Sequence, residues 1–363
     1  MLELYNGLRA ATKEIYETIY REELPDQNLD EFIKQSGYEG IHNAHERTLD
    51  LLDLFARNLK NSGARGMLSD DFGHLIRGVS GQFINNNAFH PITLSEFVSA
   101  IQDALNERQQ PEHAHNAQVG QYYNWIVDPQ EPPPGWVYQL SRKPSIVKDI
   151  ESTFQFIEFL SKYHDGNAQT YINKLADSFE HQGQACAVQR AIGELIQIPG
   201  IGIALASNFL KDSHIDLVCN LNTAEMANHY AASFVKPDRH VLRLMHLMTR
   251  RYSFDDRDAL LTKTEDELAR EYHTRTTRDP NEIWPAIEFN DFAFGGSSNL
   301  GRWKCIKDVL FWANEAEVSP FEIDRLLYFC GSAKFGFASL PTEYNARNTR
   351  EGRYDILQCY LNF

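Results

Sequence analysis

The chain is organised around residues 198–204, which run Ile-Pro-Gly-Ile-Gly-Ile-Ala. Apolar residues at helical spacing flank the two glycines, which predicts two helices joined by a tight turn. Gly200 and Gly202 permit positive φ and close approach of the backbone. Successive backbone amides can therefore converge on a phosphate at the start of the second helix. This glycine turn, residues 198–202, predicts binding to a DNA backbone without recognition of the base sequence.

A second element follows after an insertion at 211–235. Residues 236–241 run Lys-Pro-Asp-Arg-His-Val, and the apolar pattern beyond them predicts a helix that starts at Asp238. The simplest role for Asp238 is a helix cap, because its carboxylate can accept the free amides of the first turn. A capping carboxylate that faces a cleft can also take part in chemistry, so both roles remain open for this residue.

Charge limits how the protein can hold DNA. The chain carries 35 Lys and Arg against 50 Asp and Glu, a net charge of −15. Phosphate neutralisation by Lys and Arg supplies most non-specific affinity for DNA, so this balance argues against a protein that coats nucleic acid. Any contact with DNA must be local, and backbone amides at a helix start provide one without side-chain charge.

The apolar patterning predicts an all-α fold. Of the 363 residues, 42% are hydrophobic, enough for two packed lobes. Helical periodicity predicts helices over 1–22, 42–59, 72–77, 95–105, 145–162, 167–179, 185–195, 203–210, 238–248 and 319–331, and no strand is predicted. The polar and proline-rich stretch 109–135 resembles a linker. We therefore expect an N-terminal helical region at 1–140 and a second domain at 141–363.

Three features bear on cofactors and compartment. The five cysteines are scattered with no C-x-x-C pair, which argues against disulfides and zinc sites and predicts buried thiols. His42 and His45 share a helix face, but no third ligand is near in sequence, so no catalytic metal is expected. The first thirty residues lack the apolar core of a secretion signal, and no apolar run spans a membrane, so we expect a cytoplasmic protein.

The pair of elements resembles the helix-hairpin-helix DNA glycosylases, in which a Pro-Gly-(Ile/Val)-Gly hairpin precedes an aspartate at a helix start. The similarity is clearest over 192–251. It implies a two-lobed helical fold in which a damaged base is flipped out of the duplex. It also implies that Asp238 is the catalytic aspartate and that no cofactor is needed for catalysis. The implied DNA-binding residues are Pro199, Gly200, Ile201, Gly202, Ile203, Arg239, His240 and Arg243.

Two further implications concern a cation and the reaction type. In this family hairpin carbonyls hold a structural monovalent cation, which here implies the backbone of Ile198 and Ile201. Members that also cut the abasic strand have a lysine two positions after the second hairpin glycine, where it forms a Schiff base. That position is Ala204 here. The resemblance therefore implies base removal without lyase activity.

The substrate and the competing functions stay open at this stage. The partner implied is double-stranded DNA with a modified or mispaired base, and a hypermodified pyrimidine in phage DNA, hence an antiviral role, is one option beside DNA repair. A non-catalytic helix-hairpin-helix scaffold and a helical protein-interaction domain are the alternatives. The amides of residues 85–87, three consecutive asparagines, either line a base pocket or belong to an ordinary loop.

Overall fold

The computed structural model describes residues 2–19, 44–60, 66–108, 145–218, 234–249, 252, 256–274 and 296–331. Most of these residues lie in helices, as the sequence predicts. The chain divides into two compact units that interleave in sequence. Unit 1 comprises 1–38, 184–189 and 225–363, and unit 2 comprises 39–183 and 190–224. The predicted boundary near residue 140 lies outside the described residues.

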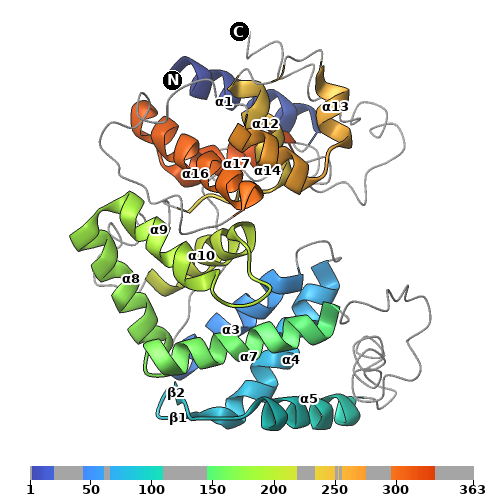
Figure 1. The fold of residues 1–363 in the computed structure, drawn as a ribbon, viewed down its shortest axis with the longest axis vertical. Helices are drawn as coiled ribbons and strands as arrows, with labels where there is room; N and C mark the ends of the chain where they lie inside the picture. Colours follow the sequence, from blue (N-terminus) through green and yellow to red (C-terminus); the bar gives the residue numbers. More distant parts are fainter. Residues whose placement is uncertain are drawn as a thin grey trace. The chain divides into compact units, whose positions relative to one another are not determined.

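Unit 2 contains most of the chain's first half (Figure 1). Its helices are α3 (Ala44–Lys60), α4 (Gly66–Ser80), α5 (Leu94–Arg108), α7 (Ser145–Tyr163), α8 (Ala168–Gln182) and α10 (Ile203–Val218), with a short 3-10 turn η1 (Gly81–Phe83) after α4. Helix α3 packs against α4, α7, α8 and α10. Its Phe55 stacks on Phe156 with ring centroids 4.1 Å apart, and Phe209 meets both rings edge-on. These three buried rings join α3, α7 and α10 into one core.

Unit 2 also contains a small β-hairpin, which the sequence analysis missed. Strand β1 (Ile84–Asn85) pairs antiparallel with β2 (Ala88–Phe89). The two loop residues, Asn86 and Asn87, have φ of 50° and 66°, as a type I′ turn requires. Asparagine tolerates this left-handed backbone, so the asparagine run forms a turn. Two-residue strands are too short to give an alternating pattern, which is why no strand was predicted.

Unit 1 is built on the C-terminal half of the chain and α1 (Leu2–Ile19). Its other helices are α12 (Arg239–Met248), α13 (Arg257–Thr262), α14 (Glu265–Thr274), α16 (Ser297–Ala316) and α17 (Pro320–Gly331). Helix α14 runs beside α16, and α12 packs on both α14 and α17 (Figure 1). Gly301 of α16 lies against the carbonyl of Ala269, leaving no room for a Cβ. Helix α9 (Gln184–Leu195) is divided between the two units at residue 189.

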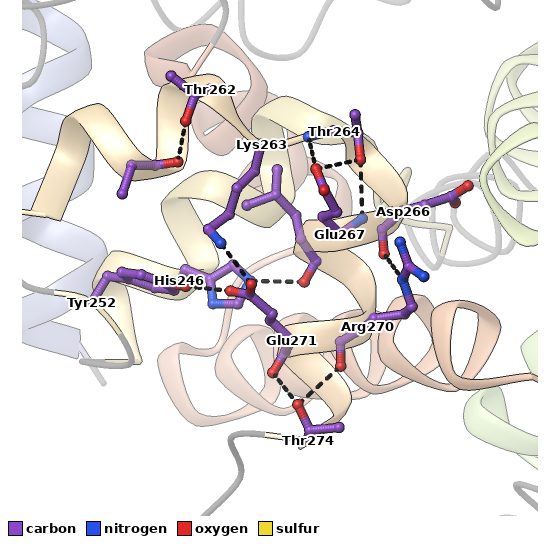
Figure 2. Close-up of polar contacts among 12 residues, drawn as sticks. His246, Tyr252, Thr262, Lys263, Thr264, Asp266, Glu267, Arg270, Glu271 and Thr274 are labelled. Carbon is purple, nitrogen blue, oxygen red and sulfur yellow. Dashed lines mark hydrogen bonds and ion pairs between the residues drawn. The ribbon is translucent and has the colours of Figure 1, made fainter.

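Polar contacts fix α12 against α14 (Figure 2). The buried His246 donates from Nε2 to the carbonyl of Leu268 at 2.8 Å. Glu271 accepts hydrogen bonds from Tyr252 and from Lys263, the latter at 2.6 Å. Thr264 and Glu267 form a capping box at the start of α14. The C-terminal part of α12, downstream of Asp238, is therefore held rigidly.

The structure also bears on membrane-spanning helices and on the burial of the cysteine thiols. No helix in the described ranges is long and apolar enough to cross a membrane. Cys305 and Cys330 are buried free thiols, as predicted, whereas Cys186 is exposed. That exposure corrects the expectation that all the thiols are buried. Cys219 and Cys359 lie outside the described residues.

Candidate functional site

The glycine turn joins two helices, as the sequence predicts. Helix α9 ends at Leu195 and α10 begins at Ile203, and both residues are buried, as are Ile198 and Ile201. Pro199 and Gly200, in contrast, are exposed. The isoleucines of the turn therefore anchor it in unit 2, while its proline and first glycine reach solvent.

The two glycines have different roles. Gly200 has a φ of 90°, which an L side chain rarely adopts, and an added Cβ would lie 2.8 Å from Ser152 Oγ. Gly202 does not have positive φ, and an added Cβ there would meet nothing within 4 Å. Both glycines permit positive φ, but only Gly200 adopts it.

Helix α10 starts without a side-chain cap. Gly202 is its N-cap, because the Gly202 carbonyl accepts the amide of Ala206 at 2.9 Å. Within the described chain, no acceptor contacts the amides of Gly202, Ile203, Ala204 or Leu205, nor that of Gly200. Helices α5, α8, α12 and α14 have such amides bonded to a threonine, asparagine or aspartate cap. The start of α10 therefore presents free donors where an anion binds most readily.

The carbonyls of the turn bear on the implied cation. Ile198 O accepts the amide of Ile201 at 3.0 Å and keeps a second lone pair, and Ile201 O has no donor in the described part of the chain. Pro199 O is taken by the hydroxyl of Ser152 at 2.6 Å. The donor set at Ile198 and Ile201 is uncharged oxygen, which suits a hard monovalent cation. No cluster of His, Cys, Asp or Glu that would hold a metal occurs among the described residues.

Asp238 is the N-cap of α12, in unit 1, as the sequence predicts. Its Oδ1 accepts the amides of His240 at 2.8 Å and Val241 at 3.0 Å. Its Oδ2 makes no hydrogen bond to a described residue and lies 3.9 Å from Nζ of Lys236. The residue is 7% exposed. One carboxylate oxygen thus caps the helix, and the other lies near the ammonium group of Lys236.

The backbone before Asp238 is held by α17. The amide of Lys236 donates to Asp324 Oδ1 at 2.9 Å, and Asp324 is fully buried. The amide of Asp238 in turn donates to Lys236 O at 2.7 Å. A fixed backbone on both sides of Asp238 orients its carboxylate. Lys236 was not among the predicted site residues, although its place two residues before the aspartate was the available signal.

Three basic residues after Asp238 were predicted to contact DNA, and the structure distinguishes them. Arg239 is exposed. His240 donates from Nδ1 to Gly331 O at 2.9 Å and meets the Tyr328 ring edge-on, and burial lowers its pKa. Arg243 is 2% exposed and donates from Nε and Nη2 to the carbonyls of Leu260 and Leu261.

These contacts change what the three residues can do. Arg243 bonds the last turn of α13, so its guanidinium stabilises the helix packing. Its contact with DNA stays a prediction, and the structural role was missed because α13 was not predicted. His240 is tied to the end of α17, and only Arg239 offers an exposed charge. Residues 284–294 and 344–354, with further aromatic and basic side chains, lie outside the described residues.

Comparison with protein-family models, with curated proteins and with solved structures found no match to this chain.

Proposed function

We propose that the protein is a monofunctional DNA glycosylase with a two-lobed, glycosylase-like helical fold. The observation that carries this proposal is the unequal use of the Asp238 carboxylate. Its Oδ1 satisfies the helix start, whereas Oδ2 makes no hydrogen bond to a described residue. A cap needs only one oxygen, so the second is available for chemistry while the first keeps it in place.

The glycine turn supplies the contact with the DNA backbone. Five free amides at Gly200 and at the start of α10 donate to phosphate oxygens, and the helix dipole favours the negative charge. The carbonyls of Ile198 and Ile201 would hold a monovalent cation, which would supply positive charge for binding an anion. These contacts between backbone amides and phosphate would allow a chain with a net charge of −15 to bind DNA. Arg239 adds one exposed charge from unit 1.

Base removal then proceeds by hydrolysis. As the bond between the flipped base and C1′ of the sugar breaks, its electron pair leaves with the base and positive charge develops on the deoxyribose. Oδ2 of Asp238 stabilises that charge and accepts a proton from the water whose oxygen attacks C1′, and this proton is then passed to the released base. Because the lyase position is occupied by Ala204, no Schiff base forms there and the strand stays intact.

The substrate class is double-stranded DNA with a modified or mispaired base. The substrate that we propose first is a hypermodified pyrimidine of phage DNA. The protein would then act in antiviral defence in the cytoplasm. The alternative role is DNA repair. This choice rests on the large helical region outside the resemblance, which offers surface for recognising a bulky adduct.

A non-catalytic DNA-binding scaffold is the second candidate, and one observation favours it. Both amides that Asp238 accepts are ordinary capping bonds, so the aspartate has a sufficient structural reason to be present. A scaffold would use the glycine turn in the same way but would release no base.

The test is to incubate the protein with duplexes that each carry one modified base, together with phage DNAs, and then treat them with alkali. A glycosylase leaves abasic sites, which alkali converts to strand breaks. Breaks in one substrate after alkali support the proposal. Binding to every duplex with no breaks in any of them would support the scaffold.

A further inference from the structure

A hollow opens beside the glycine turn, entirely within unit 2. It encloses about 590 Å³, within the range of small-molecule sites. We call it the α7 hollow. Its lining includes Gln155, Phe159, Lys162 and Tyr163 of α7, together with Gln197 and Ile198. The last two residues immediately precede Pro199, so the hollow is continuous with the turn.

One stripe of α7 joins the turn to this hollow. Ser152, Gln155, Phe159 and Lys162 recur at spacings of three and four residues, which places them on one helix face. At one end the Ser152 hydroxyl holds the carbonyl of Pro199 at 2.6 Å. The other end is Tyr163, next to Lys162. A strand held at the turn therefore has this face of α7 beside it.

Tyr163 is an aromatic ring positioned for stacking. Its side chain is among the few large apolar ones that are exposed, at 51%. Phe159 supports it with ring centroids 5.6 Å apart, and Lys162 Nζ lies 5.0 Å from the ring centroid. A ring backed by another aromatic and accompanied by a cation is the arrangement on which unpaired bases stack.

The polar groups of the hollow suit a base more than a phosphate. Gln155, Ser161 and Glu158 make no side-chain hydrogen bond to any residue that the structure describes, and Gln155 is half-buried. A carboxamide offers one acceptor and two donors, which match the edge of a base. Lys162 and Glu158 offset each other, so the lining has no excess positive charge to hold a phosphate.

We infer that the α7 hollow binds one unpaired nucleotide of the strand whose phosphate is held at the glycine turn. The base stacks on Tyr163 and its edge bonds to Gln155. This inference rests on the DNA contact in the proposed function, but not on the catalysis assigned to Asp238. It gives the protein a site for a distorted or opened duplex that lies within unit 2 alone.

The experiment compares a fully paired duplex with one that has a single-nucleotide bulge of 2-aminopurine. The wild-type chain is expected to bind the bulged duplex about tenfold more tightly and to quench the 2-aminopurine emission. Tyr163→Leu should lose both effects and bind the paired duplex as before, while Tyr163→Phe retains them. Leu2→Ala, at another exposed apolar side chain, is the matched control.

The outcomes separate this inference from the proposed function. A wild-type preference for the bulge that survives in Tyr163→Leu would overturn the hollow as a nucleotide site, as would the lack of any preference. Bulge preference that depends on Tyr163 without base release from any substrate would support the hollow and count against the glycosylase. A wild-type chain that binds neither duplex overturns both.

Discussion

The hydroxyl of Ser152 donates to the carbonyl of Pro199 at 2.6 Å, which ties the glycine turn to α7 across 47 residues of sequence. The same oxygen occupies the space that a Cβ of Gly200 would need. The turn is thus held by its own isoleucines and by a neighbouring helix. Its conformation precedes any contact with DNA, so its amides are already in place for a phosphate.

Substitution of the two turn glycines should have opposite effects. Gly200→Ala is expected to lower the free energy of unfolding by about 1–3 kcal/mol, because φ is 90° and the Cβ would meet Ser152. Gly202→Ala should change it by less than about 1 kcal/mol, since the space is open, but should weaken DNA binding by adding a methyl beside the free amides. Denaturant unfolding and duplex titration of both variants measure this. Equal loss of stability in the two would contradict the assigned roles.

Arg243 should behave as a structural residue. Arg243→Met removes the donors to the buried carbonyl of Leu260 and the partly buried carbonyl of Leu261, so the free energy of unfolding should fall by about 1–3 kcal/mol. Arg239→Met, at an exposed position, should change it by at most about 0.5 kcal/mol. Thermal or denaturant unfolding compares them. Unaltered stability in Arg243→Met would contradict this structural role.

Arg239 should instead affect DNA binding. Loss of one phosphate contact is expected to lower the slope of log Kd against log salt concentration by about 1. The measurement is titration of a duplex at several salt concentrations, with Arg270→Met as a control on another helix of unit 1. An unchanged slope in Arg239→Met would mean that this side chain does not contact a phosphate.

His164 should make unit 2 sensitive to acid. Its two ring nitrogens are buried without a hydrogen-bond partner among the described residues, between Phe159 and Tyr171. Burial, with a further contribution from Lys174, lowers the pKa of His164 to about 4, from an ordinary value near 6.5. The folded state therefore favours the neutral ring. The stability that it contributes is complete above pH 6.5 and is lost as the pH falls toward 4.

The check is the melting temperature of wild type and His164→Phe between pH 7 and pH 4. Phenylalanine keeps the ring contacts and cannot be protonated, so the variant should lose less stability over this interval. Other groups titrate equally in both proteins. Parallel curves for the two would show that His164 does not contribute to the acid sensitivity.

The sequence predicted many of the elements whose pattern is local, but not α14, although the capping box of Thr264 and Glu267 was a local signal for it. The amphipathic stripes of α1, α3, α7 and α9 have a helical period, and Asp238 is a cap that can be recognised from its neighbouring residues. Helix α16 was missed because it is buried on nearly all sides, including Arg302, Lys307 and Asp308, and so has no polar face to give a period. Charged residues in a sequence are normally taken to lie on the surface, so a buried helix that contains them cannot be recognised before their partners are known.

The local backbone features of the candidate site were predicted from the sequence, but its contacts with distant parts of the chain were not. Positive φ at Gly200 and capping by Asp238 follow from residue type and neighbours. The burial of Arg243 depends on α13, and the α7 hollow depends on residues from three separate stretches of chain. Such contacts join residues distant in sequence, and no local pattern encodes them.

Ala204 leads to a prediction about strand cleavage. Product strands should stay intact until alkali is added, and borohydride should trap no covalent adduct between protein and DNA, since no lysine occupies the lyase position. Gel analysis with and without alkali measures this. A trapped adduct would contradict the prediction and would direct attention to Lys236, whose amine lies 3.9 Å from Asp238 Oδ2.

The most direct measurement of the central claim is the single-turnover rate of base release in Asp238→Asn, on the substrate that the wild type cleaves. Asparagine caps a helix as well as aspartate does, so the fold and the affinity for DNA should stay unchanged. Thr264→Ala, which weakens the cap of α14, is the control for a general loss of unit 1 stability. We expect the rate in Asp238→Asn to fall at least about 100-fold with an unchanged Kd. A rate equal to that of the wild type would contradict the role assigned to Asp238.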